Sequence, residues 1–185
     1  MCLVVVAWNI HPRYPLIIGA NRDEDYARPA APAHWWDDAP GVFGGRDLTA
    51  GGSWLGMHRN GRYALVINQP ARPPEPRHTA SRGALVRDWV AGGGDLPQGY
   101  LERVRAREAE YAGFTLVVGA AGARGPEGVT APPGRAGAQW RLAEGITALS
   151  NSPREEPLPK ALWLERQLQF LLAEDDPDLE RLFAA

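Results

Sequence analysis

The chain contains one cysteine, Cys2, and its place directly after Met1 is the feature with the clearest chemical consequence. If Met1 is removed, Cys2 becomes the N-terminal residue, and its α-amine, with a pKa of about 7.7–8.0, can act as a base toward a thiol of about 8.5. The nucleophile and its base would then belong to the same residue. The alternative is that Cys2 has only a structural role, because a buried thiol behaves as a small hydrophobic group.

Two apolar runs predict the pair of strands that positions this cysteine. Leu3–Trp8 is apolar and rich in β-branched residues, which is typical of a buried strand, and residues 16–20 form a second such run. Prolines in the connection favour a turn, because proline fixes φ and donates no backbone hydrogen bond. With the turn centred near Pro12, paired residue numbers sum to about 24, so Val6 is expected opposite Ile18.

The same register places Cys2 opposite Arg22, within the tetrad Asn21-Arg22-Asp23-Glu24. A guanidinium near a thiol favours the thiolate, and a carboxylate such as Asp23 is placed to hold the α-ammonium that forms after proton transfer. We therefore assign Arg22 and Asp23 to catalysis, and Asn21 to contact with the substrate.

Two asparagines, Asn68 and Asn151, end predicted strands elsewhere in the chain. Their side-chain N–H groups could stabilise an oxyanion, which is what an attacking thiolate would create on a carbonyl. An asparagine at a strand end is also an ordinary strand-terminating residue. On the residues alone, both interpretations stay open.

A tryptophan pair, Trp35-Trp36, lies in a proline-rich segment over residues 25–40 that is expected to be an ordered connection. Large aromatic side chains anchor such loops on a core more often than they bind ligands. The same two residues are the candidates to line a pocket and touch the substrate.

The composition argues against several classes of partner. The 20 basic and 22 acidic residues give a formal net charge of −2 and are spread along the chain, which offers no surface typical of nucleic-acid binding. A single cysteine excludes an internal disulfide and favours a reducing compartment. The N-terminal apolar run is too short for a membrane span and does not resemble a signal peptide, so we expect a cytoplasmic protein without membrane insertion.

At 185 residues with 44% hydrophobic content, the chain can bury one core, and we expect a single domain over residues 1–185. The four glycines of residues 44–52 predict tight turns and close backbone approach, and the glycine- and proline-rich segment over 121–137 is expected to be a mobile surface loop. Strands that run before and between grouped helices predict an α+β fold. Strands are expected at Ser53–His58 and Tyr63–Asn68, which an Asn60-Gly61 turn joins as a hairpin, and at Phe114–Ala120. Two short strands, Gln139–Leu142 and Ile146–Ser150, are expected on either side of a turn at residues 143–145. Helices are expected at Arg82–Val90, Pro97–Tyr111 and Leu158–Ala173.

Five short motifs, met in order along most of the chain, carry a resemblance to a known family. They are Met1-Cys2-Leu3, the Asn-Arg-Asp-Glu tetrad, Gly-Gly-Ser-Trp-Leu-Gly over residues 51–56, Asn68 ahead of a proline, and Leu-Ser-Asn-Ser-Pro over residues 149–153. Together they resemble the NRDE family, which is the transport and Golgi organisation 2 family. That family is similar in fold to the N-terminal nucleophile hydrolases, particularly the choloylglycine hydrolases and penicillin V acylases.

The resemblance implies an αββα sandwich of antiparallel sheets flanked by helices. It also implies that Cys2 is the nucleophile, that Asp23 contacts the α-amine, and that Asn68 and Asn151 are active-site asparagines. Those hydrolases carry an arginine directly after the glycine that ends the second strand, where this chain has Ala20.

Relatives that resemble this chain continue into further strands, so we expect a C-terminally shortened domain. A shortened sheet would have an exposed edge, which favours a homodimer.

The function implied by this resemblance is a cysteine amidohydrolase that cleaves the C–N bond of an unidentified small amide and uses no cofactor. The alternative is a non-catalytic protein that handles haem, because eukaryotic relatives are linked to haem trafficking and secretory-pathway organisation. A third reading is a catalytically inactive remnant of the fold. Candidate haem ligands are Cys2, His11, His34, His58 and His78.

Overall fold

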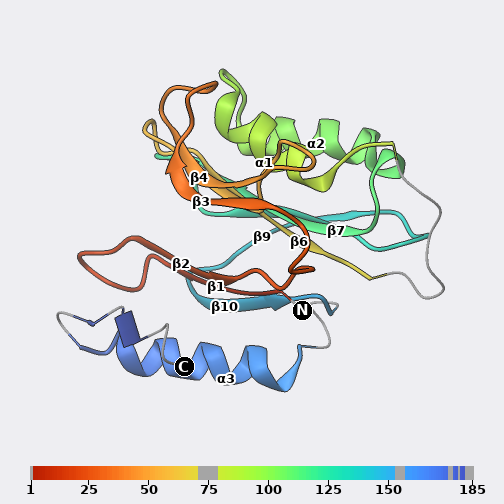
Figure 1. The fold of residues 1–185 in the computed structure, drawn as a ribbon. Helices are drawn as coiled ribbons and strands as arrows, with labels where there is room; N and C mark the ends of the chain where they lie inside the picture. Colours follow the sequence, from red (N-terminus) through yellow and green to blue (C-terminus); the bar gives the residue numbers. More distant parts are fainter. Residues whose placement is uncertain (1, 71–78, 153–156, 175–176, 179, 182–185) are drawn as a thin grey trace. The chain divides into compact units, whose positions relative to one another are not determined.

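The structure is a computed structural model that describes residues 2–70, 79–152, 157–174, 177–178 and 180–181. The chain divides into two compact units: unit 1 comprises Met1–Asp23 and Leu142–Ala185, and unit 2 comprises Glu24–Arg141. Each unit contains one antiparallel sheet, drawn with its helices in Figure 1.

The elements follow one another along the chain with short connections. In order, they are β1 Leu3–Trp8, β2 Leu16–Asn21, β3 Ala30–Trp35, β4 Val42–Asp47, β5 Leu55–His58, β6 Tyr63–Asn68, α1 Arg82–Ala91, α2 Pro97–Ala106, the 3-10 turn Glu108–Glu110, β7 Phe114–Gly119, β8 Glu127–Ala131, β9 Ala138–Arg141, β10 Gly145–Ser150 and α3 Pro159–Leu171.

The sheet of unit 1 has the strand order β10-β1-β2, so β1 is central. Val6 pairs with Ile18, which confirms the register expected from the proline-containing turn. Helix α3 packs against β10 and β1, where Leu168 and Leu171 join Val5 in a buried cluster. Unit 1 therefore has a small core between its sheet and one helix.

The sheet of unit 2 has the order β3-β4-β5-β6-β7-β8-β9. Helix α1 packs against β6 and β5, with the fully buried Trp89 as its largest core side chain. The helix begins after Ser81, whose hydroxyl accepts a hydrogen bond from the backbone N–H of Gly83. The predicted helix over residues 82–90 and the strand pair around the Asn-Gly turn are confirmed, and Gly61 in that turn has φ of +86°.

Three strands form in segments where the sequence predicts none, and the loop expected up to Gly137 is wrong where β8 forms. β3 lies within residues 25–40; it tolerates Pro32 because it is an outer strand with a register break. β4 contains Gly44 and Gly45, which packing requires, since the Trp54 ring occupies the place of a Cβ on Gly45. β8 forms within residues 121–137 and is almost wholly buried.

One helix boundary and one strand pairing also differ from the prediction. The helix expected to reach Tyr111 ends at Ala106 and is followed by a separate 3-10 turn. The short strands β9 and β10 are not partners: β9 pairs with β8 and β10 pairs with β1. The chain between them passes from one sheet to the other.

The Gly-Gly-Ser-Trp-Leu-Gly motif has a structural role in unit 2. Gly52 lies against the start of α1, where an added Cβ would come within 2.3 Å of the Gly83 carbonyl carbon. The Ser53 hydroxyl lies 2.8 Å from the backbone carbonyl oxygens of Gly45 and Leu55. The motif joins the β4–β5 connection to α1. None of the helices in the described part of the chain has the length and apolar character of a membrane span.

Candidate active site

Cys2 directly precedes β1, the central strand of the unit 1 sheet. Leu3 pairs with Asn21 on one side and with Ser150 on the other. Carried one residue further, these registers set Cys2 opposite Arg22 on the β2 side and opposite Asn151 on the β10 side. Three of the residues that the sequence singled out therefore occupy adjacent positions at one end of one sheet.

The thiol of Cys2 is half-buried, and its Sγ donates to the backbone carbonyl oxygen of Asp23 over 3.9 Å. Asp23 is exposed and Arg22 is half-buried, as the chain leaves β2. The Asn21 side chain at the end of β2 is also exposed. The chain after β2 thus brings the backbone of Asp23 back to the cysteine.

Asn151 is held in a turn by the residues on either side of it. The hydroxyl oxygens of Ser150 and Ser152 lie 2.8 Å apart, and the Ser152 backbone N–H reaches the Ser150 hydroxyl at 3.4 Å. Ser150 is buried and Asn151 is half-buried. The sequence motif over residues 149–153 contains both serines but predicts no role for them, although the Ser-Asn-Ser pattern is typical of hydroxyl-stabilised turns.

Asn68 belongs to unit 2, at the end of β6, and is half-buried. It pairs with Phe114, so the two side chains share the face of the sheet that α1 and α2 cover. Gln69 lies on the opposite face, where its amide donates to the Thr115 hydroxyl at 3.0 Å. An approach of Asn68 to the substrate of Cys2 stays a prediction.

In the tryptophan pair, also in unit 2, Trp35 lies at the surface and Trp36 is buried in the core. Trp35 is 48% exposed, and the Arg59 guanidinium lies 3.8 Å from the centre of its ring. Trp36 is 3% exposed, donates its indole N–H to the Gly44 carbonyl, and lies under the Arg46 guanidinium. The geometry of Trp36 matches the loop-anchoring interpretation, and a role of either residue in substrate contact stays a prediction.

A second part of unit 2 forms a connected chain of polar side chains. The Thr115 and Thr130 hydroxyls lie 3.2 Å apart across β7 and β8, and the Trp140 indole donates to Thr130 at 3.0 Å. The hydrogen bond from Gln69 to Thr115 extends this row to the end of β6. The sequence reading missed this row, since two threonines in separate strands give no local pattern.

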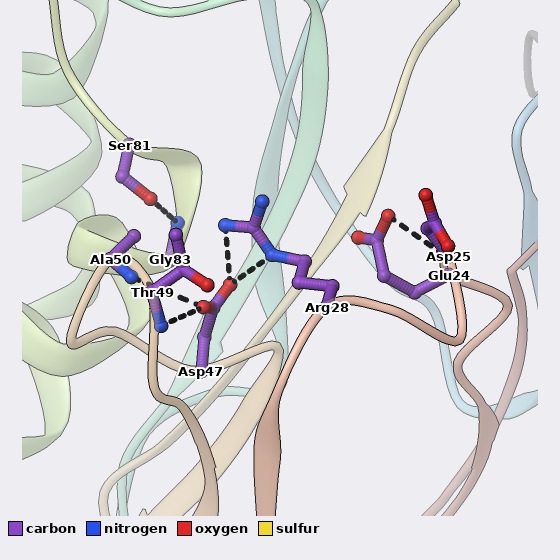
Figure 2. A network of polar contacts seen from close by, with 8 residues as sticks. All are labelled: Glu24, Asp25, Arg28, Asp47, Thr49, Ala50, Ser81 and Gly83. Atoms are coloured by element: carbon purple, nitrogen blue, oxygen red, sulfur yellow. Dashed lines mark hydrogen bonds and ion pairs between the residues drawn. The ribbon is translucent and has the colours of Figure 1, made fainter.

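The tetrad ends at Glu24, which begins unit 2. Its carboxylate accepts the backbone N–H of Asp25 at 3.2 Å, as Figure 2 shows beside the contact between Arg28 and Asp47. Within the tetrad, Asn21, Arg22 and Asp23 therefore lie with Cys2 in unit 1, whereas Glu24 starts the chain of unit 2.

Three of the four histidines are described, and each has a hydrogen-bonding contact at a ring nitrogen. His11 is buried and accepts the Arg13 backbone N–H at Nδ1; Nδ1 of His34 lies 2.8 Å from the Pro32 carbonyl; Nδ1 of His58 accepts from Asn60. His78, the fourth candidate haem ligand, lies outside the described residues. Within the described residues, no group of three or more histidine, cysteine, aspartate or glutamate side chains is arranged to hold a metal ion.

Comparison with known proteins matches the whole chain to one family. The model of the family described as Transport and Golgi organisation 2 matches residues 1–185. A bovine Transport and Golgi organization protein 2 homolog is 33% identical over 190 residues, which cover 98% of this chain and 67% of the bovine protein. The human homolog is 32% identical over 124 residues, which cover 63% of this chain and 44% of the human protein.

Among solved structures, the chain resembles the Caenorhabditis elegans ortholog of N-acylethanolamine-hydrolyzing acid amidase. The TM-score is 0.64 at 12% sequence identity, and the match covers 92% of this chain and 79% of the amidase chain. This likeness shows the fold alone, and with the two antiparallel sheets and their helices it confirms the predicted class, an α+β fold of antiparallel sheets flanked by helices.

Proposed function

The chain belongs to the Transport and Golgi organisation 2 family, and we propose that it is an amidohydrolase with Cys2 as an N-terminal nucleophile. The observation that carries the proposal is the place of Cys2 directly before the central strand, where the registers of β1 carried one residue further lie between Arg22 and Asn151. The name of the worm amidase with the same fold states that it hydrolyses N-acylethanolamines, which are amides. That name supports a small amide as the class of substrate.

The first step is formation of a thioester. Once Met1 is removed, the Cys2 α-amine accepts the thiol proton, and the thiolate sulfur attacks the carbonyl carbon of the amide. The carbonyl electron pair moves to oxygen, where the side-chain N–H groups of Asn151 and Asn68 stabilise the charge. The α-ammonium then gives its proton to the amide nitrogen, the C–N bond breaks, and the amine leaves.

The second step is hydrolysis of the thioester by water. The α-amine accepts a proton from the water as its oxygen attacks the carbonyl carbon, and the proton passes to the departing sulfur of Cys2. The products are a carboxylic acid and an amine, with the enzyme restored and no cofactor consumed.

The remaining tetrad residues have supporting roles in this proposal. The Arg22 cation favours the thiolate, because it is next to Cys2 in the register. The Asp23 carboxylate orients the α-ammonium, with its backbone carbonyl already at the thiol. Asn21, Trp35 and Trp36 are assigned to the walls that contact the substrate. We propose the cytoplasm as the compartment, because a single reduced thiol suits it.

The experiment that tests this function is intact-mass spectrometry of the purified protein, before and after treatment with a β-lactam probe. We expect a mass without Met1 and one added probe, which peptide mapping locates at Cys2. A Cys2→Ser variant is the matched control for fold, since it changes one atom, and should keep its thermal unfolding but take up no β-lactam. Retention of Met1 in labelled protein, or the same turnover of an amide panel by Cys2→Ala, would overturn the proposal.

A further inference from the structure

The end of strand β10 directs two consecutive side chains to opposite faces of the unit 1 sheet. Ala148 packs against the buried cluster that contains Leu168 of α3, so Ser150, two residues further along the strand, projects from that same face. By the same alternation Asn151, the next residue, is directed to the face away from α3. Ser150 is 5% exposed, and Asn151 is half-buried.

The face away from α3 also carries Cys2. Val5 belongs to the buried cluster under α3, and Cys2, three residues earlier, projects from the opposite face because the side chains of a strand alternate. Carried one residue further, the β1–β10 register sets Cys2 opposite Asn151. Side chains that oppose each other across an antiparallel pair have Cβ atoms about 4.5–5.5 Å apart. The Asn151 amide is therefore within reach of the oxygen of a carbonyl that the Cys2 sulfur attacks.

Ser150 closes a turn around Asn151. Its hydroxyl oxygen accepts the backbone N–H of Ser152 at 3.4 Å, and the hydroxyl oxygens of the two serines lie 2.8 Å apart. A serine that bonds the N–H two residues further on forms a side-chain turn, which fixes the backbone of the residue between them. Because backbone dihedrals decide which side-chain rotamers are allowed, this turn also sets the direction of the Asn151 amide.

Burial of Ser150 keeps this turn closed. A hydroxyl at the surface exchanges a protein partner for water at little cost, whereas a buried hydroxyl loses its hydration and needs partners inside the fold. Both contacts with Ser152 supply such partners on the face that α3 covers. The packing under α3 therefore stabilises one backbone conformation at Asn151.

We propose that Ser150 is a positioning residue of the candidate site: through its turn, it holds the side-chain N–H of Asn151 toward the oxyanion that forms at Cys2. Ser150 itself projects toward α3 and does not touch the substrate. The inference rests on the proposed amidohydrolase function, and it adds the group that orients a donor to the oxyanion.

Two reactions of Cys2 separate this role from general damage to the fold. A fluorescent penicillin acylates the thiolate: the sulfur attacks the lactam carbonyl carbon, the carbonyl oxygen takes the negative charge, and the lactam C–N bond breaks as its nitrogen receives a proton from the α-ammonium. Iodoacetamide alkylates the same sulfur by displacing iodide from a CH₂ carbon, and no oxyanion forms. The second-order rate of each reaction is measured by mass spectrometry of quenched samples.

Ser150→Ala should slow acylation roughly tenfold and leave alkylation within about twofold of the wild-type rate. Asn151→Ala, which removes the donor itself, should slow acylation by about 100-fold or more. Ser150→Thr keeps the hydroxyl oxygen and should retain most of the acylation rate. The matched control is Thr147→Val, which removes a hydroxyl from the same strand and should leave both rates unchanged.

A double-mutant cycle shows whether Ser150 acts through Asn151. In an Asn151→Ala chain, the further change Ser150→Ala should leave the acylation rate as it is, because the group that Ser150 orients is already absent. Ser152→Ala removes the hydroxyl contact but keeps the backbone N–H, so it should slow acylation only roughly threefold. Ser152→Ala replaces Ser150→Ala in the cycle if the latter shows no cooperative thermal unfolding.

The outcomes distinguish this inference from the function on which it rests. If the penicillin labels the wild-type chain and Ser150→Ala at the same rate, the positioning role is overturned and the proposed function stands. Equal slowing of acylation and alkylation, or additive losses in the cycle, overturns the role in the same way. A wild-type chain that is alkylated but never acylated overturns both. A loss confined to acylation, and absent from the Asn151→Ala background, supports the inference.

Discussion

Arg28 binds Asp47 through two guanidinium nitrogens, with Nε at 2.8 Å and Nη2 at 2.7 Å from the same carboxylate oxygen (Figure 2). The other oxygen of Asp47 accepts the backbone N–H groups of Thr49 and Ala50. Burial alone would raise the pKa of Asp47, but these contacts hold that pKa below its ordinary value. One carboxylate thus ties the turn after β4 to the segment that leads into β3.

We expect Asp47→Ala to lower the free energy of unfolding by about 2 kcal/mol, because it removes hydrogen bonds to a charged group. Since folding depresses this pKa, the stabilisation is present above the ordinary value of 3.8 and is lost as pH falls through the lower folded value. Chemical denaturation at several pH values should show the gap between wild type and variant closing in acid.

The control for Asp47 is Asp38→Ala. Asp38 also pairs with an arginine, Arg46, at 2.8 Å, but its side chain is 65% exposed and the pair is screened by solvent, so the loss of stability should be much smaller than for Asp47. Equal losses in the two variants would contradict the assignment of a structural role to Asp47.

Gly52→Ala tests the close packing between the β4–β5 connection and α1. An added Cβ would lie 2.3 Å from the carbonyl carbon and 2.5 Å from the carbonyl oxygen of Gly83, which are backbone atoms and cannot rotate away. We expect a loss of about 1–3 kcal/mol or more, seen as a lower Tm. Gly99→Ala in α2 is the matched change, because no atom lies within 4 Å of its added Cβ, and it should stabilise by about 0.5–1 kcal/mol.

Tyr100→Phe should change the response of stability to alkaline pH. The Tyr100 hydroxyl donates to the Leu85 carbonyl at 2.6 Å, and burial raises its pKa above the ordinary value of 10.0. A group with a raised folded pKa stabilises fully below the unfolded value and loses that contribution as pH rises through the folded value. The variant should therefore lose about 1 kcal/mol near neutral pH and decline less steeply above pH 10.

Tyr63→Phe separates the effect of removing an ionisable hydroxyl from the effect of removing a hydrogen bond. Burial also raises the pKa of Tyr63, but no hydrogen bond of its hydroxyl is found between described residues. Denaturation curves should show a flatter alkaline decline for this variant with little loss at neutral pH. A neutral-pH loss as large as that of Tyr100→Phe would contradict the role given to the Leu85 contact.

The parts of the fold that could be predicted are those in which one local signal determines the pairing. The proline-containing turn sets the β1–β2 register, so the opposition of Val6 and Ile18 follows from counting. β4 could not be predicted in this way, because Gly44 and Gly45 are present for contacts with Leu55 and Trp54 made only after folding. Glycine-rich sequence therefore looks like a turn when tertiary packing makes it a strand.

The candidate site shows the same division. The opposition of Cys2 and Arg22 follows from the β1–β2 register, whereas the position of Asn151 on the other side of Cys2 requires β10, a strand far along the chain, to pair with β1. Sequence reasoning suggested β10 as a partner of β9, since short strands separated by a turn usually pair. Local sequence patterns carry no information on the long-range pairing of β10 with β1, so they could not predict the position of Asn151.

Arg22→Ala should slow the alkylation of Cys2, because the guanidinium at the adjacent register position favours the thiolate, which is the reactive form. We expect the second-order rate with iodoacetamide at pH 7 to fall by about 3–10-fold, and Arg22→Lys to retain most of it. Arg166→Ala, an exposed arginine of α3 in the same unit, is the matched control and should leave the rate unchanged. Each rate is measured by quenching the reaction at a series of times and quantifying the alkylated protein by mass spectrometry. Identical rates for Arg22→Ala and wild type would remove the arginine from the site while leaving Cys2 as the nucleophile.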